Sequence, residues 1–342
     1  MIIGLTGRNA SGKGLVAKRL QKGGFRYLSL SDEIRVELKA KGMELSRENL
    51  IDEGRRLRTD FGDGVLAQRI MQRITLFENY VVDSVRNPGE VKALRRMKNF
   101  YLLRVDAPIG IRYERLKKRA RPGDSRGFDQ FKADEERELV SSDPAAQQLI
   151  ATGEMADFVI KNDADIETLN QHVVSVFQQA SLKTDRPDWD EYFMRIATVV
   201  ALRANCVKRR TAAVVVKDRR VISTGYNGTP RGVTNCYEGG CPRCYSLAES
   251  GSSLGECRCS HAEENSIVQA AYHGVSLKDA TMYTIFSPCL LCSKMIINSG
   301  IKEVVYLSEY PMASASARLL KDAGVLLRSM KLPEDSIDLV LS

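Results

Sequence analysis

The chain has 342 residues, of which 43% are hydrophobic and 27% are charged, and its formal net charge at neutral pH is +8. This composition is that of a globular protein with room for about two domains, and it excludes repeat and low-complexity chains. No stretch approaches the roughly 18 apolar residues of a membrane span, and the first residues lack the pattern of a signal peptide. We therefore expect no membrane partner and a location in the cytoplasm, with the nucleus as an alternative.

The positive net charge suits partners that carry phosphate, although a charge of this size is also a common means of keeping a protein soluble. The basic runs around Lys117 and Arg209 are short. They are typical of solvated faces or of contacts to small phosphorylated ligands, so nucleic acid is not the expected partner.

The first part of the chain alternates short apolar runs with helical patterns. Strands are expected at residues 1–7, 79–86, 100–108 and 156–163, and helices at residues 13–22, 89–97, 109–120 and 166–180. Such an alternation predicts an α/β domain with a parallel sheet and flanking helices. We place this domain at residues 1–181 and a polar linker, which contains Pro187, at residues 182–188.

The segment from Gly7 to Gly14, GRNASGKG, nearly matches the phosphate-binding loop G-x-x-x-x-G-K-[ST]. Gly12 would let the backbone approach a phosphate, and Lys13 offers that phosphate a positive charge. Gly14, however, replaces the hydroxyl residue that holds magnesium in this motif. The segment therefore predicts a phosphate-binding loop that lacks its magnesium ligand.

Three residues in later segments of this domain could complete a phosphoryl-transfer site. Asp83 ends a predicted strand and could hold a metal ion through water, while Arg119 or Arg121 could stabilise a transferring phosphoryl group. Both arginines could equally be surface residues at a helix end. With the segments GLTGRNASGKG and VVDSVRNPGE, this domain resembles P-loop nucleoside-monophosphate kinases and dephospho-coenzyme A kinases, which implies a kinase-like fold.

The chain after the linker begins with a predicted amphipathic helix. Asp188 can cap it, with Glu191 three residues later as the capping-box partner, and apolar residues recur on one face. Strands are expected as a pair within residues 211–228, with a turn at Lys217 to Arg220, and singly at three later stretches: 281–287, 301–308 and 324–330. About five strands with interleaved helices predict a mixed three-layer α/β/α domain at residues 189–342.

The central motif of this second domain is SHAEEN, followed further along by SPCLLC. It matches the H-x-E…P-C-x-x-C signature of zinc-dependent nucleobase deaminases. His261, Cys289 and Cys292 supply the three protein ligands of a catalytic zinc ion, which leaves a fourth position for water. Glu263 is then free to move protons while a zinc-activated hydroxide attacks the amine-bearing ring carbon. The alternative is a structural zinc site, which would have no use for Glu263.

The stretches GYNGTPRGVTNCYEGGCPRCY, CSHAEEN and SPCLLC resemble deoxycytidylate (dCMP) deaminases, most closely those of the fungal type. The resemblance implies a cytidine-deaminase-like fold and a homo-oligomer that converts dCMP to dUMP for thymidylate synthesis. It also implies dCTP as activator and dTTP as inhibitor, with Mg²⁺ on the effector triphosphate. It places Asn227 near the deoxyribose, and Gly225, Tyr226 and Gly228 at an effector site between subunits. Asn227 could instead be present only because a turn needs its backbone conformation.

All eight cysteines lie after residue 205, and six of them are outside the central motif. Their short C-x-x-C spacings, in a reducing compartment, indicate zinc rather than disulfides. A resemblance to the phage branch of the same family implies a second, structural zinc ion. The positions of three of its ligands match Cys206, Cys236 and Cys259. The fourth ligand in the phage enzymes is a histidine with no counterpart here, so Cys244 would replace it, with Cys241 or Cys257 as alternatives. The six thiols could also be free, or could form two sites.

Three functions are consistent with these patterns. The first is a dCMP deaminase whose P-loop domain is catalytically inactive and serves nucleotide sensing or assembly. The second is a bifunctional enzyme with an active ATP-dependent nucleotide kinase in front. The third is a polynucleotide cytidine or adenosine deaminase that binds through the basic runs, although the GYNG context matches the mononucleotide enzymes.

Overall fold

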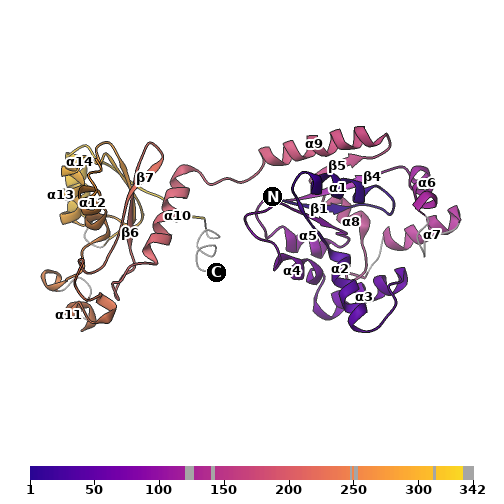
Figure 1. Cartoon of the computed structure of the whole chain (residues 1–342), viewed down its shortest axis with the longest axis horizontal. Coiled ribbons are helices and arrows are strands. Elements are labelled where there is room, and N and C mark those ends of the chain that lie inside the picture. The colour runs from indigo at the N-terminus through magenta and orange to yellow at the C-terminus, as the bar shows by residue number, and fades with distance from the viewer. Residues whose placement is uncertain (120–126, 140–142, 247–248, 250–252, 311–312, 334–342) are drawn as a thin grey trace. The chain divides into compact units, whose positions relative to one another are not determined.

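The computed structural model describes residues 1–119, 127–139, 143–246, 249, 253–310 and 313–333. The chain forms two compact units, Met1–Asp185 and Arg186–Ser342, and each has a β-sheet covered by helices (Figure 1). The division falls inside the predicted linker at residues 182–188. Every helix among the described residues is too short or too polar to cross a membrane.

The N-terminal unit is built on a five-stranded parallel sheet. Its strands are β1 (Ile2–Thr6), β2 (Arg26–Ser29), β3 (Tyr80–Asp83), β4 (Phe100–Asp106) and β5 (Phe158–Lys161), in the order β2-β3-β1-β4-β5. All four neighbouring pairs are parallel. The predicted parallel sheet is confirmed, and it contains one strand, β2, that the sequence patterns missed.

Helices cover both faces of this sheet. They are α1 (Lys13–Lys22), α2 (Leu30–Ala40), α3 (Arg47–Phe61), α4 (Val65–Met71), α5 (Pro88–Leu94), α6 (Ile109–Arg119), α7 (Phe128–Leu139), α8 (Leu149–Glu154) and α9 (Ile166–Leu182). Successive side chains of a strand point to opposite faces of a sheet. Ile2 of β1 therefore joins the core formed with α2 to α5, whereas Ile3 and Leu5 join the core formed with α1 and α9.

The C-terminal unit is built on a five-stranded mixed sheet. Its strands are β6 (Ala212–Lys217), β7 (Arg220–Tyr226), β8 (Thr281–Phe286), β9 (Glu303–Ser308) and β10 (Leu326–Ser329), in the order β10-β9-β8-β6-β7. Strand β6 is antiparallel to β7 and β8, while β8, β9 and β10 are parallel. Asp218 and Arg219 have positive φ angles, as a two-residue hairpin turn requires. All five predicted strands are confirmed.

Helices form a layer on each face of the second sheet. On one face lies α10 (Trp189–Ala201), and on the other lie α12 (Ala262–Tyr272), α13 (Leu290–Asn298) and α14 (Ala313–Asp322). The short helices η1 (Cys236–Glu238), α11 (Pro242–Tyr245) and η2 (Leu254–Glu256) lie between β7 and α12 in the chain. The predicted three-layer arrangement is confirmed. The predicted cap of α10 is also present, because Asp188 Oδ1 accepts a 2.8 Å hydrogen bond from the backbone nitrogen of Glu191.

Candidate functional site

Three metal-ligand side chains meet at the N-terminal ends of α12 and α13. His261 directly precedes α12, Cys289 directly precedes α13, and Cys292 lies in the first turn of α13. The Nδ1 atom of His261 is 3.4 Å from the Sγ atom of each cysteine. Because α12 and α13 share one face of the sheet, the fold brings together two motifs that are far apart in sequence.

The three donor atoms fit a zinc ion. They all lie within 4.8 Å of one another, and histidine and cysteine are ligands that zinc prefers. Hydrogen bonding to Cys292 and to His261 lowers the pKa of the Cys289 thiol to about 4, which favours the thiolate that binds metal. Three protein ligands leave one position of a tetrahedral ion open, as in catalytic sites and unlike structural ones.

Glu263 lies beside this ligand set. The residue is only 6% exposed, and its Oε2 atom is 3.7 Å from the Sγ atom of Cys292. Burial raises the pKa of Glu263 to about 7. A carboxyl group with a pKa near neutrality can both accept and donate a proton at neutral pH, which is what general acid/base catalysis requires.

Gly225 lets α12 approach β7 closely. A Cβ atom at this position would lie 2.2 Å from the carbonyl oxygen of Ala262 and 2.3 Å from the backbone nitrogen of Ser266. The same contact is fixed by the side-chain amide of Asn265, which donates a 2.7 Å hydrogen bond to the carbonyl oxygen of Tyr226. The structure thus gives Gly225 and Tyr226 a part in positioning the helix of the ligand histidine, and their part in effector binding stays a prediction.

The side chain of Asn227 is buried and bonded within the chain. Its Oδ1 atom accepts a 3.0 Å hydrogen bond from the backbone nitrogen of Thr211, and its Nδ2 atom donates a 2.6 Å hydrogen bond to the carbonyl oxygen of Arg209. The next residue, Gly228, forms an isolated β-bridge with Ser260, directly before the ligand histidine. These contacts brace the loop beside the zinc-ligand set, and contact of Asn227 with a sugar stays a prediction.

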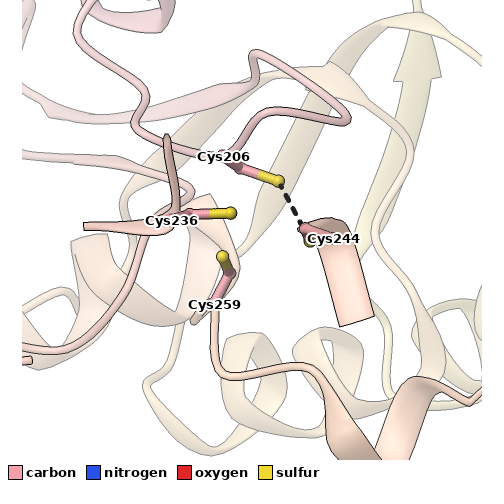
Figure 2. A group of neighbouring side chains, drawn as sticks. All are labelled: Cys206, Cys236, Cys244 and Cys259. Carbon is pink, nitrogen blue, oxygen red and sulfur yellow. Dashed lines mark hydrogen bonds between the residues drawn. The ribbon is translucent and has the colours of Figure 1, made fainter. Parts of the chain in front are cut away.

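The six remaining cysteines form two overlapping groups, to which the segment before β6 contributes Cys206 and the segment between β7 and α12 contributes the other five. The four predicted structural ligands have Sγ atoms within 4.8 Å of one another, and these atoms point toward a common centre (Figure 2). They are Cys206, Cys236, Cys244 and Cys259. The two alternative ligands, Cys241 and Cys257, form a second such group with Cys244 and Cys259. Either group matches the four thiolates of a structural zinc site.

In the N-terminal unit, the loop from Gly7 to Gly14 joins β1 to α1, as the phosphate-binding motif requires. Gly7 and Gly12 have φ angles of +138° and +106°, and a Cβ atom on Gly12 would lie 2.0 Å from Asn162 Nδ2. The Lys13 ammonium group donates hydrogen bonds of 2.7 and 2.9 Å to the carbonyl oxygens of Gly7 and Arg8. Both glycines are therefore needed for the loop conformation itself.

This loop faces a cavity of about 810 Å³, a size typical of small-molecule sites. Asp83 lines the cavity, and its carboxylate accepts hydrogen bonds from the backbone nitrogen of Ser84 (2.7 Å) and the hydroxyl of Tyr27 (3.1 Å). Arg119 lines it as well, whereas Arg121 lies outside the described residues. The fold thus brings the predicted loop, the predicted carboxylate and one predicted arginine into a single cavity.

Several cavity residues were missed by the sequence patterns. They are arginines of α2, α3, α6 and the segment after β3: Arg35, Arg47, Arg58, Arg86 and Arg115. The guanidinium of Arg115 donates a 3.2 Å hydrogen bond to Asn162 Oδ1, close to the glycine loop. Arg115 and Arg119 are four residues apart on α6, and this spacing, which places both on one helix face, was the available sequence signal.

Two known protein families match the chain, one in each of its two units. The family described as "Cytidine and deoxycytidylate deaminase zinc-binding region" matches residues 187–308, and the family described as "AAA domain" matches residues 3–140. A deoxycytidylate deaminase of Schizosaccharomyces pombe is 41% identical over 263 residues, which are 76% of this chain and 79% of that protein. A deoxycytidylate deaminase of Saccharomyces cerevisiae is 49% identical over 152 residues, which are 44% of this chain and 47% of that protein.

A solved structure, that of the dCMP deaminase from the cyanophage S-TIM5 in complex with dCMP and dUMP, is 31% identical with a TM-score of 0.37. It covers 43% of this chain and 99% of the phage chain. The fold of the C-terminal unit and its histidine and cysteine ligands define a zinc-dependent deaminase, joined to a P-loop domain. On the similarity to the Schizosaccharomyces pombe protein, the chain belongs to the deoxycytidylate deaminase family, as the sequence motifs predicted.

Proposed function

We propose that the C-terminal unit hydrolyses dCMP to dUMP and ammonia and so supplies dUMP for thymidylate synthesis. The observation that carries the proposal is the buried carboxyl group of Glu263, 3.7 Å from Cys292 in a set of three zinc-type ligands with an open fourth position. The two yeast relatives are deoxycytidylate deaminases, which supports dCMP as the substrate.

The proposed mechanism divides the chemistry between a metal ion and one side chain. A zinc ion held by His261, Cys289 and Cys292 would act as a Lewis acid that makes water a nucleophile at neutral pH. Glu263 takes the proton of that water, delivers it to the ring nitrogen beside the amine-bearing carbon, and then assists the departure of ammonia. Its pKa of about 7 suits both directions of proton transfer.

Replacement of Glu263 tests this assignment. We expect Glu263→Gln to lower kcat for dCMP by about 10²- to 10⁴-fold, the usual contribution of general acid/base catalysis, while the zinc content is unchanged. The matched control is Glu264→Gln, one residue along. Glu264 Oε2 accepts a 3.2 Å hydrogen bond from the backbone nitrogen of His261, and glutamine can keep this capping bond. If Glu263→Gln retained activity like that of Glu264→Gln, the proton-transfer role would be wrong.

Regulation and assembly form a second part of the proposal. We infer that dCTP activates the enzyme with Mg²⁺ on its triphosphate, that dTTP inhibits it, and that the active form is a homo-oligomer with the loop Gly225 to Gly228 near the effector. The support is family membership and the position of this loop against α12.

The decisive assay is deamination of dCMP, CMP, cytidine and dCTP, each with and without dCTP and dTTP. A polynucleotide turned over faster than dCMP would replace this proposal with a polynucleotide deaminase.

For cofactors, we propose one catalytic zinc ion at the His261 site and at least one structural zinc ion among the six other cysteines. The support is the type of donor atom in each group and the family match to a zinc-binding region. Metal analysis of the purified chain would therefore give two or more zinc ions per chain. A content of one zinc ion per chain would exclude the proposed structural zinc ion.

For the N-terminal unit, we propose nucleotide binding without phosphoryl transfer. The loop and the basic cavity support the binding of phosphate, while Gly14 offers no hydroxyl for magnesium. The alternative, an active ATP-dependent nucleotide kinase, is favoured by Asp83 and Arg119, which line the same cavity. The test is to incubate the protein with ATP and each nucleoside monophosphate. ADP formation at enzyme-like turnover, abolished by Lys13→Ala, would establish the kinase instead.

A further inference from the structure

The six cysteines outside the His261 site, Cys206 before β6 and five between β7 and α12, are arranged for two metal ions rather than one. One group holds Cys206, Cys236, Cys244 and Cys259, and the other holds Cys241, Cys244, Cys257 and Cys259. Within each group, the sulfur atoms all lie within 4.8 Å of one another. Cys244 and Cys259 belong to both groups. We propose that these six cysteines bind two zinc ions as a binuclear cluster in which Cys244 and Cys259 bridge the two ions.

The number of sulfur atoms agrees with this arrangement. A structural zinc ion takes four ligands, so two separate thiolate sites would need eight cysteines. When two thiolates are shared, six are enough, because each ion then has two bridging ligands and two ligands of its own. A single ion would instead leave two thiols of this group without a metal, and one of them would be fully buried: Cys241 in one case and Cys236 in the other.

The segment between β7 and α12, which carries five of the six cysteines, has little else to hold it together. Among the described residues from 229 to 260, the buried apolar side chains are all cysteines: Cys236, Cys241, Cys244 and Cys259. The larger apolar side chains of this segment are exposed, as Val233, Tyr237 and Tyr245 illustrate. A segment without an apolar core depends on cross-links or metal for a fixed structure.

The backbone presents the bridging cysteines in short, constrained turns. Cys241 directly precedes α11 and Cys244 lies within it, and the backbone nitrogen of Cys244 donates a 3.1 Å hydrogen bond to the carbonyl oxygen of Cys241. The backbone nitrogen of Arg258 lies 3.4 Å from Cys241 Sγ, so it can donate to a thiolate there. This bond ties the Cys257-x-Cys259 segment to the α11 turn, and a shared metal pair would extend the same connection.

The charge of the surroundings suits the cluster. Two zinc ions and six thiolates carry a net charge of −2, which needs basic neighbours when it is buried. The chain places five basic residues within four positions of a cluster cysteine: Lys208, Arg209, Arg210, Arg243 and Arg258. Arg243 lies between the ligands Cys241 and Cys244 and is itself only 8% exposed. A buried guanidinium at this point matches a buried anionic cluster.

The cluster goes beyond the proposed deamination, but its position gives it a consequence for that site. Cys259 is two residues before His261, and the intervening Ser260 is paired with Gly228 by hydrogen bonds of 2.9 and 3.2 Å. A bridging ligand at Cys259 would fix the segment that leads into the zinc ligand His261. Loss of both ions should therefore loosen His261, whereas loss of one should affect it less.

The first experiment counts metal ions in the full chain, purified without chelators. Mass-spectrometric metal analysis is expected to give three zinc ions per chain, and two after His261→Ala, since the cluster has its own ligands. A value of two in the unaltered chain, or of one in His261→Ala, would overturn the binuclear cluster. Neither result depends on whether the enzyme deaminates dCMP, so the count and the proposed function can fail separately.

The second experiment detects the bridge directly. Zinc X-ray absorption of the His261→Ala chain is expected to show four sulfur neighbours at about 2.3 Å and a zinc neighbour closer than about 4.6 Å, because each bridging sulfur is about 2.3 Å from both ions. Sulfur neighbours without a zinc neighbour would overturn the proposal.

Two single-ligand variants complete the test. Cys206→Ser and Cys257→Ser each remove a ligand that belongs to one ion alone, so both should bind fewer than three zinc ions. The matched control is Ser253→Ala, an exposed residue of the same segment, which should keep all three. With a single four-thiolate ion, one of the two cysteine variants would keep the full zinc content, and that result would exclude the shared arrangement.

Discussion

At Gly14 the phosphate-binding loop has space for the side chain that it lacks. A Cβ atom at this position would meet no heavy atom within 4 Å. Gly14 lies in the first turn of α1, where serine costs a helix less than glycine does. Packing therefore does not explain the missing hydroxyl, in contrast to Gly7 and Gly12, whose positive φ angles exclude most other residues.

Restoring the hydroxyl should restore a response to magnesium. We expect Gly14→Ser to bind ATP about tenfold more tightly with Mg²⁺ than without it, a difference of about 1.4 kcal/mol, because this hydroxyl holds the metal in working loops. Calorimetric titration of both chains with ATP measures the effect. The control is Gly110→Ser on α6, where a side chain also has free space, and which should bind ATP like the unaltered chain. If Mg²⁺ changed the ATP affinity equally in the unaltered chain, Gly14→Ser and Gly110→Ser, the metal would not be held by a hydroxyl at position 14.

Some functional residues could be predicted from the sequence, and others could not. The catalytic ligand set could be found because H-x-E and C-x-x-C are local patterns, and the structure brings His261, Cys289 and Cys292 within reach of one ion. The sharing of Cys244 and Cys259 could not be found in the same way, because it depends on how four turns fold together. Arg115 was missed for a similar reason, since only the fold aims it at the glycine loop.

At the scale of elements, the contact between α12 and β7 sets the position of the catalytic residues. We expect Gly225→Ala to lower deamination by at least tenfold and to reduce stability by about 1–3 kcal/mol, because the added methyl group would overlap the backbone of α12. Activity assays and urea unfolding measure the two effects. Gly232→Ala, in the loop that follows β7, is the control, since a Cβ atom there meets nothing within 4 Å, although its positive φ adds modest strain. If Gly225→Ala left deamination unchanged, α12 could shift without disturbing the catalytic residues.

Asp190 joins three elements of the C-terminal unit. It lies in the first turn of α10, and its carboxylate accepts hydrogen bonds from Tyr283 of β8 (2.8 Å) and Arg328 of β10 (2.7 Å). Hydrogen bonding to Arg328, and then to Tyr283, lowers the pKa of Asp190 below its ordinary value. A carboxylate with a lowered folded-state pKa adds stability above its unfolded pKa, and this stability is lost as the pH falls through the folded-state value.

The stability of the C-terminal unit should therefore fall with acidification partly through Asp190. We expect Asp190→Asn to be less stable than the unaltered chain at neutral pH, and the difference to shrink below about pH 4, where an unperturbed aspartate is protonated. Urea midpoints measured between neutral pH and pH 3 give this comparison. Asp218→Asn, in the β6–β7 turn, should follow the unaltered chain. A constant difference at every pH would rule out the carboxylate as the cause.

The elements themselves were predictable to different degrees. The strands β1, β3 and β4 are mostly buried apolar runs, and β5 alternates buried apolar residues with exposed ones, so all four have recognisable strand patterns. Strand β2 has only four residues, two of them exposed, and it is set by pairing with β3 rather than by its own sequence. The polar helix α3 was missed because charged residues occupy most of its length, and its buried positions include Glu53 and Arg58.

At the scale of the whole molecule, each unit has its own hydrophobic cores. The buried core residues of the N-terminal unit run from Ile2 to Ala180, and those of the C-terminal unit from Phe193 to Val325. No described core cluster contains residues of both units. Units of this kind commonly unfold as separate cooperative transitions.

We therefore expect two thermal transitions, each sensitive to a different ligand. Removal of zinc with a chelator should lower only the transition of the C-terminal unit, because structural zinc contributes folding free energy to the unit that binds it. ATP at about 100 times its Kd should raise only the N-terminal transition, by about 2.7 kcal/mol of stability. Differential scanning calorimetry measures both, and Lys13→Ala should abolish the response to ATP while leaving the response to the chelator. A single transition that moved with both ligands would show instead that the two units fold as one, and that the P-loop domain communicates with the deaminase through stability.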